Sequence, residues 1–183
     1  MLNQQEQQQL INLAKESIQY GLEHGQRLSV DINDFPATLT PVRASFVTLK
    51  INNQLRGCIG TLTAHSPLVI DIADNSFAAA FKDPRFPPLS KAEFESLEYH
   101  ISILSEPEPM KVQSEEDLLT QLRPDIDGLV LHEGNRRSTF LPSVWESLPE
   151  PRSFLEHLKQ KAGLPADYWS DTIHFERYTV EEF

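Results

Sequence analysis

The chain has 183 residues, of which 39% are hydrophobic, and a formal net charge of −11 at pH 7. This length and composition predict a substantial core, folded as one domain over residues 1–183 or as two subdomains that share a core. The acidic charge argues against general nucleic-acid binding, because neutralising phosphates requires a basic face. The single cysteine, Cys58, excludes an intrachain disulfide and suits a reducing compartment.

The N-terminal segment does not resemble a targeting sequence. It reads MLNQQEQQQLINLAKES, without the basic start, apolar stretch and small-residue cleavage site of a signal peptide. No apolar run approaches the roughly 18 residues that suggest a membrane span. We therefore expect a soluble, cytoplasmic protein with no membrane partner.

The first part of the chain predicts a helix followed by a hairpin. Apolar residues recur at helical spacing over residues 4–24, and Gly25 is suited to end that helix. Alternating and β-branched residues predict a strand over 45–51. A turn at 52–53 then leads into a second strand over 55–62.

A second helix is predicted after this hairpin. Ser66 followed by Pro67 is a strong helix start, with serine as the N-cap and proline at the first helical position. Helical spacing of apolar residues continues to about Phe81. The proline-rich segment 83–88 cannot be helical and must be a loop. Ser90 then opens a capping-box pattern for a short helix.

The second half of the chain repeats these kinds of element. In chain order they are a strand over 99–104, a helix over 115–122, a hairpin over 128–141 with its turn at 133–135, a helix over 153–162 and a strand over 172–179. Strand, turn, strand and helix occur in this order twice, which is compatible with a structural duplication. Helices interspersed with hairpins predict an α+β fold with mostly antiparallel sheets.

The loop length of the first hairpin decides which residues share a face. A two-residue loop places Leu49 opposite Arg56, whereas a three-residue loop places it opposite Gly57. We prefer the longer loop because it gathers the aliphatic residues on one face. Its pairs are Ile51 with Leu55, Leu49 with Gly57, and Val47 with Ile59. Arg56 then lies on the opposite face, together with Lys50 and Cys58.

Two long motifs flank the second helix: LRGCIGT at Leu55–Thr61 and AAAFKDPRFPPL at Ala78–Leu89. Shorter motifs lie along the chain at Phe46–Leu49, Ile101–Leu104, Asp127–Leu129, Phe140–Pro142 and Lys161–Leu164. In this order the motifs closely resemble the AMMECR domain family, also called the A component of the AmmeMemoRadiSam system. The resemblance implies an α+β fold of two intimately packed subdomains with flanking helices, in which the terminal segments of the chain pack together.

The same resemblance implies two partners, a Memo-like protein and a radical-SAM protein. It supplies neither an established reaction nor a cofactor, so it leaves open whether the protein is an enzyme. Related sequences often place a second cysteine before the Lys-Ala-Gly-Leu segment, where this chain has Lys159 and Gln160. A mechanism that requires paired intrachain thiols is therefore excluded.

Cys58 is the sharpest catalytic candidate. Gly57 and Gly60 remove side-chain bulk around it, so that a ligand or another backbone can approach closely. Arg56 and Lys50, if they share its face, favour the thiolate and a nucleophilic role. The alternative is a small buried hydrophobe beside glycines that permit a tight bend. Because no sequence-adjacent base completes a nucleophile pattern, we prefer a binding role for the motif.

The loop after the second helix supplies a second group of candidates. Asp83 is suited to accept hydrogen bonds from loop amides, and Arg85 is suited to bind an anion or a carboxylate. The structural alternative is an Asp–Arg contact that locks the helix-to-loop transition. Phe86 is equally suited to docking a partner and to closing the core.

Four histidines are candidate bases: His65, His100, His132 and His174. Their spacing contains no HExxH or comparable ligand pair, so we predict no metal site. The leading hypothesis is an accessory protein that binds a small anionic ligand or a protein partner at a cleft formed by the LRGCIG motif. The competing hypothesis is an enzyme that uses Cys58 as a nucleophile or redox thiol.

Overall fold

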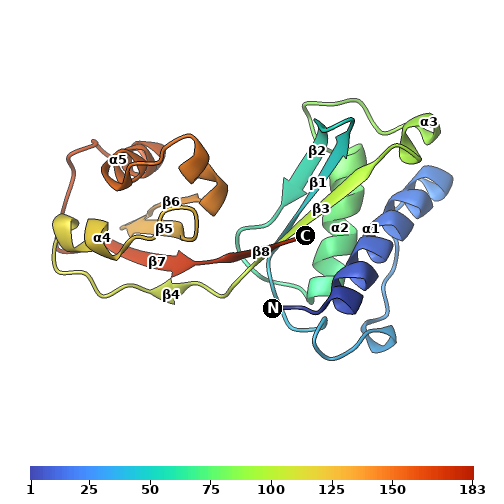
Figure 1. The fold of residues 1–183 in the computed structure, drawn as a ribbon, viewed down its shortest axis with the longest axis horizontal. Coiled ribbons are helices and arrows are strands. Elements are labelled where there is room, and N and C mark those ends of the chain that lie inside the picture. Colours follow the sequence, from blue (N-terminus) through green and yellow to red (C-terminus); the bar gives the residue numbers. More distant parts are fainter. The chain divides into compact units, whose positions relative to one another are not determined.

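The computed structural model describes residues 1–183 and divides into two compact units. Unit 1 consists of Met1–Leu104 with Glu181–Phe183, and unit 2 consists of Ser105–Val180. The chain forms two four-stranded antiparallel sheets, with strand orders β2-β1-β3-β8 and β4-β7-β5-β6, and helices accompany both (Figure 1). The predicted α+β class is confirmed. None of the helices combines the length and hydrophobicity needed to cross a lipid bilayer.

The first sheet is built mainly from the N-terminal half of the chain. Its unit contains α1 (Gln4–His24), the 3-10 turn η1 (Ile32–Asp34), β1 (Ser45–Ile51), β2 (Gln54–Gly60), α2 (Leu68–Phe81), α3 (Lys91–Phe94) and β3 (Glu98–Leu104), and β8 (Val180–Glu182) completes the sheet. α1 packs against α2, and α2 lies along β1 and β2 (Figure 1). These helices therefore cover one face of the sheet.

The ends of the two long helices follow local chemistry. Asn3 begins α1 with a capping box, and Gly25 ends it in the left-handed conformation, as predicted. α2 begins at Leu68, one residue later than predicted, and Pro67 precedes it in an extended conformation. The reason is a short β-bridge between Pro67 and Val42, which keeps the proline outside the helix.

The two termini of the chain meet in unit 1. The main-chain amide of Leu2 donates to Glu181 Oε1 at 2.7 Å. Phe183 exchanges two main-chain hydrogen bonds with Ile101 of β3. The expectation that the terminal segments pack together is therefore confirmed. The strand β8 that brings them together was not predicted from the sequence.

The second sheet is built from the C-terminal half of the chain. Its unit contains β4 (Glu108–Pro109), α4 (Glu115–Gln121), β5 (Gly128–Glu133), β6 (Arg136–Phe140), the 3-10 turn η2 (Pro142–Glu146), α5 (Pro151–Lys161) and β7 (His174–Tyr178). The predicted helices and hairpin are confirmed to within about two residues, as expected for element ends. The short strand β4 was not predicted from the sequence.

Three strands of each sheet have the same connectivity. In each, a hairpin is followed by a helix and then by a strand that returns beside the hairpin's first strand: β3 beside β1, and β7 beside β5. A helix also precedes each hairpin. This repeated order supports the structural duplication that the sequence pattern suggested.

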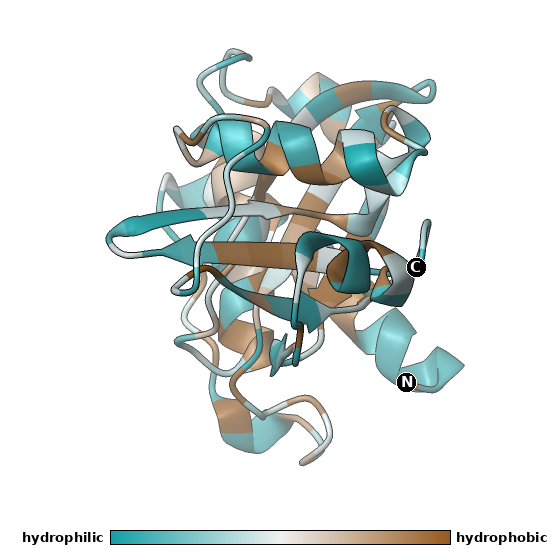
Figure 2. Ribbon diagram, turned by 90° about the vertical axis from the view of Figure 1, so that its left-hand side faces the viewer, coloured by the Kyte–Doolittle hydropathy of each residue, from teal (hydrophilic) through white to brown (hydrophobic).

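Each unit has its own hydrophobic cluster. In unit 1, Leu49 of β1 and Ile72 of α2 are fully buried members of one cluster. In unit 2, the rings of Trp145 and Phe154 stack with centroids 3.8 Å apart inside the other. Figure 2 shows brown hydrophobic stretches in the strands, and brown alternating with teal along the helices, as expected for amphipathic helices on sheets.

A buried polar network fixes α2 to β1. Asp71 of α2 accepts hydrogen bonds from the amide and hydroxyl of Ser45 at 2.9 and 2.7 Å, and from the Asn75 side chain at 2.9 Å. Thr61 adds a hydroxyl bond at 3.1 Å. Burial raises the pKa of Asp71, although the hydrogen bonds from Ser45 and Thr61 oppose the rise. The network fixes the position of α2 against β1, the strand that pairs with the Cys58 strand β2.

Candidate functional site

A β-bulge in β2 sets the directions of its side chains. Val47 pairs with Ile59 and Leu49 pairs with Gly57, as the preferred register predicted. The next pair is Lys50 with Leu55, so one residue of β2 is left over between these pairs. That extra residue is Arg56. A bulge of this kind bends the strand and redirects the side chain of the extra residue.

The tip of the hairpin differs from the prediction. Asn52 and Asn53 form a two-residue turn with φ of 52° and 61°, the left-handed conformation that asparagine tolerates in tight hairpins. Ile51 therefore pairs with Gln54 rather than Leu55. Leu55, expected on the core face, is 42% exposed. The three-residue register is right at the base of the hairpin and wrong at its tip, because the bulge absorbs the difference.

Arg56 does not share the face of Cys58, which corrects the sequence prediction. The residue is only 9% exposed. Its Nε donates to Glu93 Oε1 at 2.7 Å, and its Nη2 donates to the carbonyl of Pro87 at 2.9 Å. The cation expected beside the thiol is thus a buried tie between β2 and the segment that leads into α3.

The partner of Arg56 belongs to the predicted capping box. Glu93 accepts the amide and hydroxyl of Ser90 at 2.9 and 2.7 Å, which confirms that box at the start of α3. Hydrogen bonds from the Arg56 guanidinium, followed by those from Ser90, lower the pKa of Glu93 from 4.5 to about 2. Glu93 is therefore ionised throughout the physiological range.

The two glycines of the motif serve close packing of the protein itself. A Cβ on Gly57 would lie 2.1 Å from the carbonyl oxygen of Ala79, so its absence lets β2 approach the backbone of α2. A Cβ on Gly60 would lie 2.3 Å from the ring of Phe46 on β1. The structural reason for both glycines is thus the approach of another part of unit 1.

The Asp83 carboxylate joins the two long motifs. Its Oδ2 accepts the main-chain amide of Cys58 at 2.9 Å, and its Oδ1 accepts the amide of Arg85 at 3.1 Å. The Arg85 guanidinium donates to both carboxylate oxygens, at 2.9 and 2.7 Å, and to the carbonyl of Cys58 at 3.3 Å. We call this set of contacts between Asp83, Arg85 and the Cys58 backbone the edge clip.

The edge clip protects an otherwise open strand. β2 lies at the edge of its sheet, so the outward amide and carbonyl of Cys58 have no neighbouring strand to bond. Asp83 and Arg85 take the place of that strand. Asp83 is 4% exposed, and the Arg85 guanidinium, with the Cys58 amide adding to it, holds the pKa of the Asp83 carboxyl well below its usual range. The predicted Asp–Arg contact after the second helix is confirmed.

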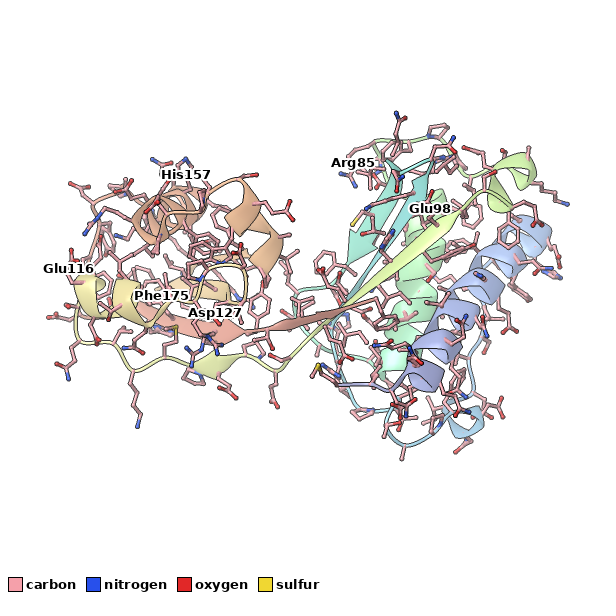
Figure 3. All side chains as sticks on the ribbon, viewed as in Figure 1. Arg85, Glu98, Glu116, Asp127, His157 and Phe175 are labelled. Atoms are coloured by element: carbon pink, nitrogen blue, oxygen red, sulfur yellow. The ribbon has the colours of Figure 1, made fainter.

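Arg85 remains accessible although its inner edge is bound. Its side chain is 54% exposed, against 2% for Asp83. Figure 3 labels Arg85 beside β2, in the segment that follows α2. The half-buried ring of Phe86 lies between two guanidiniums, 5.6 Å from that of Arg85 and 5.8 Å from that of Arg56. These cation–π contacts stiffen the loop.

The thiol of Cys58 lies on the face of the first sheet that α1 and α2 leave uncovered. Thr48 of the central strand β1 pairs with Cys58 of β2 on one side and with His100 of β3 on the other side. The Thr48 hydroxyl donates to Cys58 Sγ at 3.1 Å. Lys50 projects from the same face, because it is two residues beyond Thr48. The predicted shared face is therefore right for Lys50 and Cys58.

His100 is the one candidate base that the sheet brings into the row of Cys58. The sequence named it but could not place it, because strand order is not readable from local pattern. His132 and His174 stack on each other in unit 2, with ring centroids 4.9 Å apart. His65 lies in the exposed loop between β2 and α2. No group of three or more His, Cys, Asp or Glu side chains has a geometry that could hold a metal ion.

Comparison with known proteins places these motifs in a family. A family profile described as AMMECR1 matches residues 11–183. A protein of Methanothermobacter thermautotrophicus is 33% identical over 175 residues, covering 93% of this chain and 88% of the relative. A protein of Thermotoga maritima is 41% identical over 141 residues, covering 76% of each chain. The crystal structure of an uncharacterized protein, PH0010 from Pyrococcus horikoshii, matches with a TM-score of 0.84 and 30% identity, over 99% of this chain and 92% of that one.

The ion pair between Glu93 and Arg56 predicts a pH-dependent stability. Because the pKa of Glu93 is lowered by folding, its contribution is complete above about pH 4.5 and is lost as the pH falls towards 2. We expect Glu93→Gln to lower the free energy of unfolding by about 1.5 kcal/mol at pH 7, allowing for solvent screening of a partly exposed carboxylate. Urea unfolding between pH 7 and pH 3 measures this difference.

The neighbouring Glu95→Gln is the matched control, since Glu95 is exposed and has no ion-pair partner. The difference between wild type and Glu93→Gln should shrink as the solution is acidified. A difference that stays constant down to pH 3 would contradict the ion-pair account.

Proposed function

This chain belongs to the AMMECR1 family, and we propose that it is an accessory binding protein of the AmmeMemoRadiSam system that binds an anionic group beside Cys58. The partners would be a Memo-like protein and a radical-SAM protein. The anionic group is carried either by a small molecule or by an acidic segment of one of these proteins. Its surface is the uncovered face of the first sheet together with the edge clip.

The observation that supports this proposal best is the state of Arg85. Its guanidinium is oriented by the buried Asp83 carboxylate and by the Cys58 carbonyl, while more than half of the side chain stays exposed. A guanidinium held in this way loses little conformational freedom when it binds an oxyanion. It is bonded to the main chain of Cys58, whose thiol is free and half-buried.

Lys50 supplies a second cation for the same surface. It lies on the face of Cys58, is half-buried, and has no ion-pair partner. Asp83 already balances the charge of Arg85. Lys50 forms no ion pair, although Glu98 of β3 is its cross-strand partner, so its ammonium is the cation left to attract an anion there. Arg56 is removed from the binding set, because its Nε and Nη2 bind Glu93 and Pro87 and the whole residue, including the unpaired Nη1, is buried.

Two variants test this proposal. Arg85→Gln removes the oriented guanidinium, and Lys50→Gln removes the free ammonium without touching the edge clip. We expect each to weaken binding by about tenfold, the effect of one charge-assisted hydrogen bond. Titration with inorganic phosphate, followed by nuclear magnetic resonance, measures the small-molecule arm. Co-precipitation with the purified Memo-like and radical-SAM proteins measures the partner arm.

Arg27→Gln is the matched control, because Arg27 makes only an exposed ion pair with Asp74 in the same unit. It should bind like wild type in both arms. Unchanged binding by the folded Arg85 and Lys50 variants would reject this surface. Binding of phosphate alone supports a small-molecule ligand, whereas partner capture alone supports a protein ligand.

An enzymatic function is the alternative, and one observation favours it. The Thr48 hydroxyl donates to Cys58 Sγ, and His100 continues the row on the next strand. Adjacent strands are about 4.8 Å apart, so a substrate or water held above Thr48 lies within reach of both the thiol and the imidazole. Cys58 would then act as a nucleophile or redox thiol, with His100 as its base.

The rate of Cys58 alkylation at different pH values separates the two functions. A catalytic thiolate supported by His100 reacts rapidly already near pH 6, and His100→Gln slows that reaction. The binding proposal expects instead an alkylation rate that rises steadily with pH and is the same in His100→Gln. A rate that His100 controls would move the assignment to the enzyme.

A further inference from the structure

The β5–β6 turn of unit 2 borders a hollow of about 510 Å³. One wall carries Glu133 and Arg136, which flank the turn. The opposite wall is mainly apolar and is formed by Leu164, Pro165 and the ring of Tyr168, in the segment that follows α5. A hollow of this size falls in the range that small organic ligands occupy. None of these residues takes part in the Cys58 surface.

Two opposite charges face this hollow without pairing with each other. Glu133 and Arg136 are direct cross-strand partners, so their side chains project on the same side of the hairpin. Such a pair ordinarily forms an ion pair, yet neither is found in an ion pair here. Each is instead bound to groups of the segment that forms the opposite side of the hollow.

The carboxylate of Glu133 is fixed by hydroxyl groups. Its Oε1 accepts hydrogen bonds from Tyr168 Oη at 2.8 Å, Ser170 Oγ at 3.1 Å and Thr172 Oγ1 at 2.8 Å. These bonds, that of Tyr168 above all, lower the pKa of Glu133. A Coulombic interaction with His174 also lowers this pKa, so the result is an ionised carboxylate that is held mainly by neutral hydroxyl donors.

Arg136 is anchored on the other side of the turn. Its Nη1 donates to the carbonyl oxygen of Gly163, and the residue is exposed. The turn between the two charged residues carries Gly134, and a Cβ there would meet no atom within 4 Å. The turn therefore leaves the rim of the hollow open.

We propose that this hollow binds a free α-amino acid with an apolar side chain. The ammonium group would lie against Glu133, the carboxylate against Arg136, and the side chain against Leu164, Pro165 and Tyr168. A fixed carboxylate and a fixed guanidinium, held apart beside an apolar wall, match the two charged ends and the side chain of such a zwitterion. A ligand with only one of the charges leaves one protein charge unmatched.

The test uses three ligands that differ in one charge each. L-leucine carries both charges, L-leucinamide lacks the carboxylate, and N-acetyl-L-leucine lacks the ammonium. Binding to the full chain is followed by nuclear magnetic resonance at the amides of 133–136 and 164–168. We expect L-leucine to bind with a dissociation constant of about 1 mM or below, and each derivative to bind about tenfold more weakly.

Two variants assign each charge to its side chain. Glu133→Gln should weaken L-leucine and L-leucinamide but leave N-acetyl-L-leucine unchanged. Arg136→Gln should weaken L-leucine and N-acetyl-L-leucine but leave L-leucinamide unchanged. Glu146→Gln and Arg27→Gln, which alter exposed residues outside the hollow, are the matched controls.

Three outcomes would overturn the proposal. One is the absence of any shift at about 10 mM L-leucine, a concentration well above the expected dissociation constant. Another is equal binding of all three ligands, which would mean that the charges do not contribute. The third is a lowered stability of the Glu133→Gln variant together with wild-type binding of L-leucine, which would make the carboxylate a purely structural group.

Discussion

The hydrogen bond from the Cys58 amide to the Asp83 carboxylate is the constraint on which the candidate site depends. It joins an edge strand to the loop after α2, two segments that are 25 residues apart in the chain. An edge strand without a neighbour invites pairing with other chains. Here a side-chain carboxylate and a guanidinium bond the backbone of Cys58 in place of a neighbouring strand. The edge of β2 is therefore protected at Cys58, while the sheet face that carries the thiol stays uncovered.

This constraint gives the two arginines of the long motifs different tasks. Arg56 is turned by the bulge into a buried tie to Glu93 and Pro87. Arg85 completes the edge clip and keeps an exposed guanidinium surface beside the thiol. The two motifs therefore supply one buried, structural cation, Arg56, and one accessible cation, Arg85. The difference follows from strand geometry rather than from residue type.

Local chemistry was enough to predict much of the fold. The helices, the hairpins and the Gly25 and Ser90 end signals depend on residues within a few positions of each other, and the structure has them close to where they were expected. The register at the base of the first hairpin was also predictable from its aliphatic pattern. The strands β4 and β8 were missed because two or three residues carry no periodicity, and their pairing depends on strands far away in the chain.

The candidate site was only partly predictable for the same reason. The motif identified Cys58, Asp83 and Arg85, but the orientation of Arg56 depends on a bulge whose contacts lie more than 30 residues away. The position of His100 depends on β3 pairing with β1 rather than with β2. Non-local pairing of this kind is what a single sequence does not display.

Hydrogen exchange of the Cys58 amide tests the edge clip most directly, and the Gly60 amide is an internal reference. By the alternation of an antiparallel strand, both amides point outward from the same edge, but only that of Cys58 meets an acceptor, the Asp83 carboxylate. The account predicts that the Cys58 amide is protected as strongly as amides inside the sheet, while the Gly60 amide exchanges quickly. Equally fast exchange at both positions would contradict it.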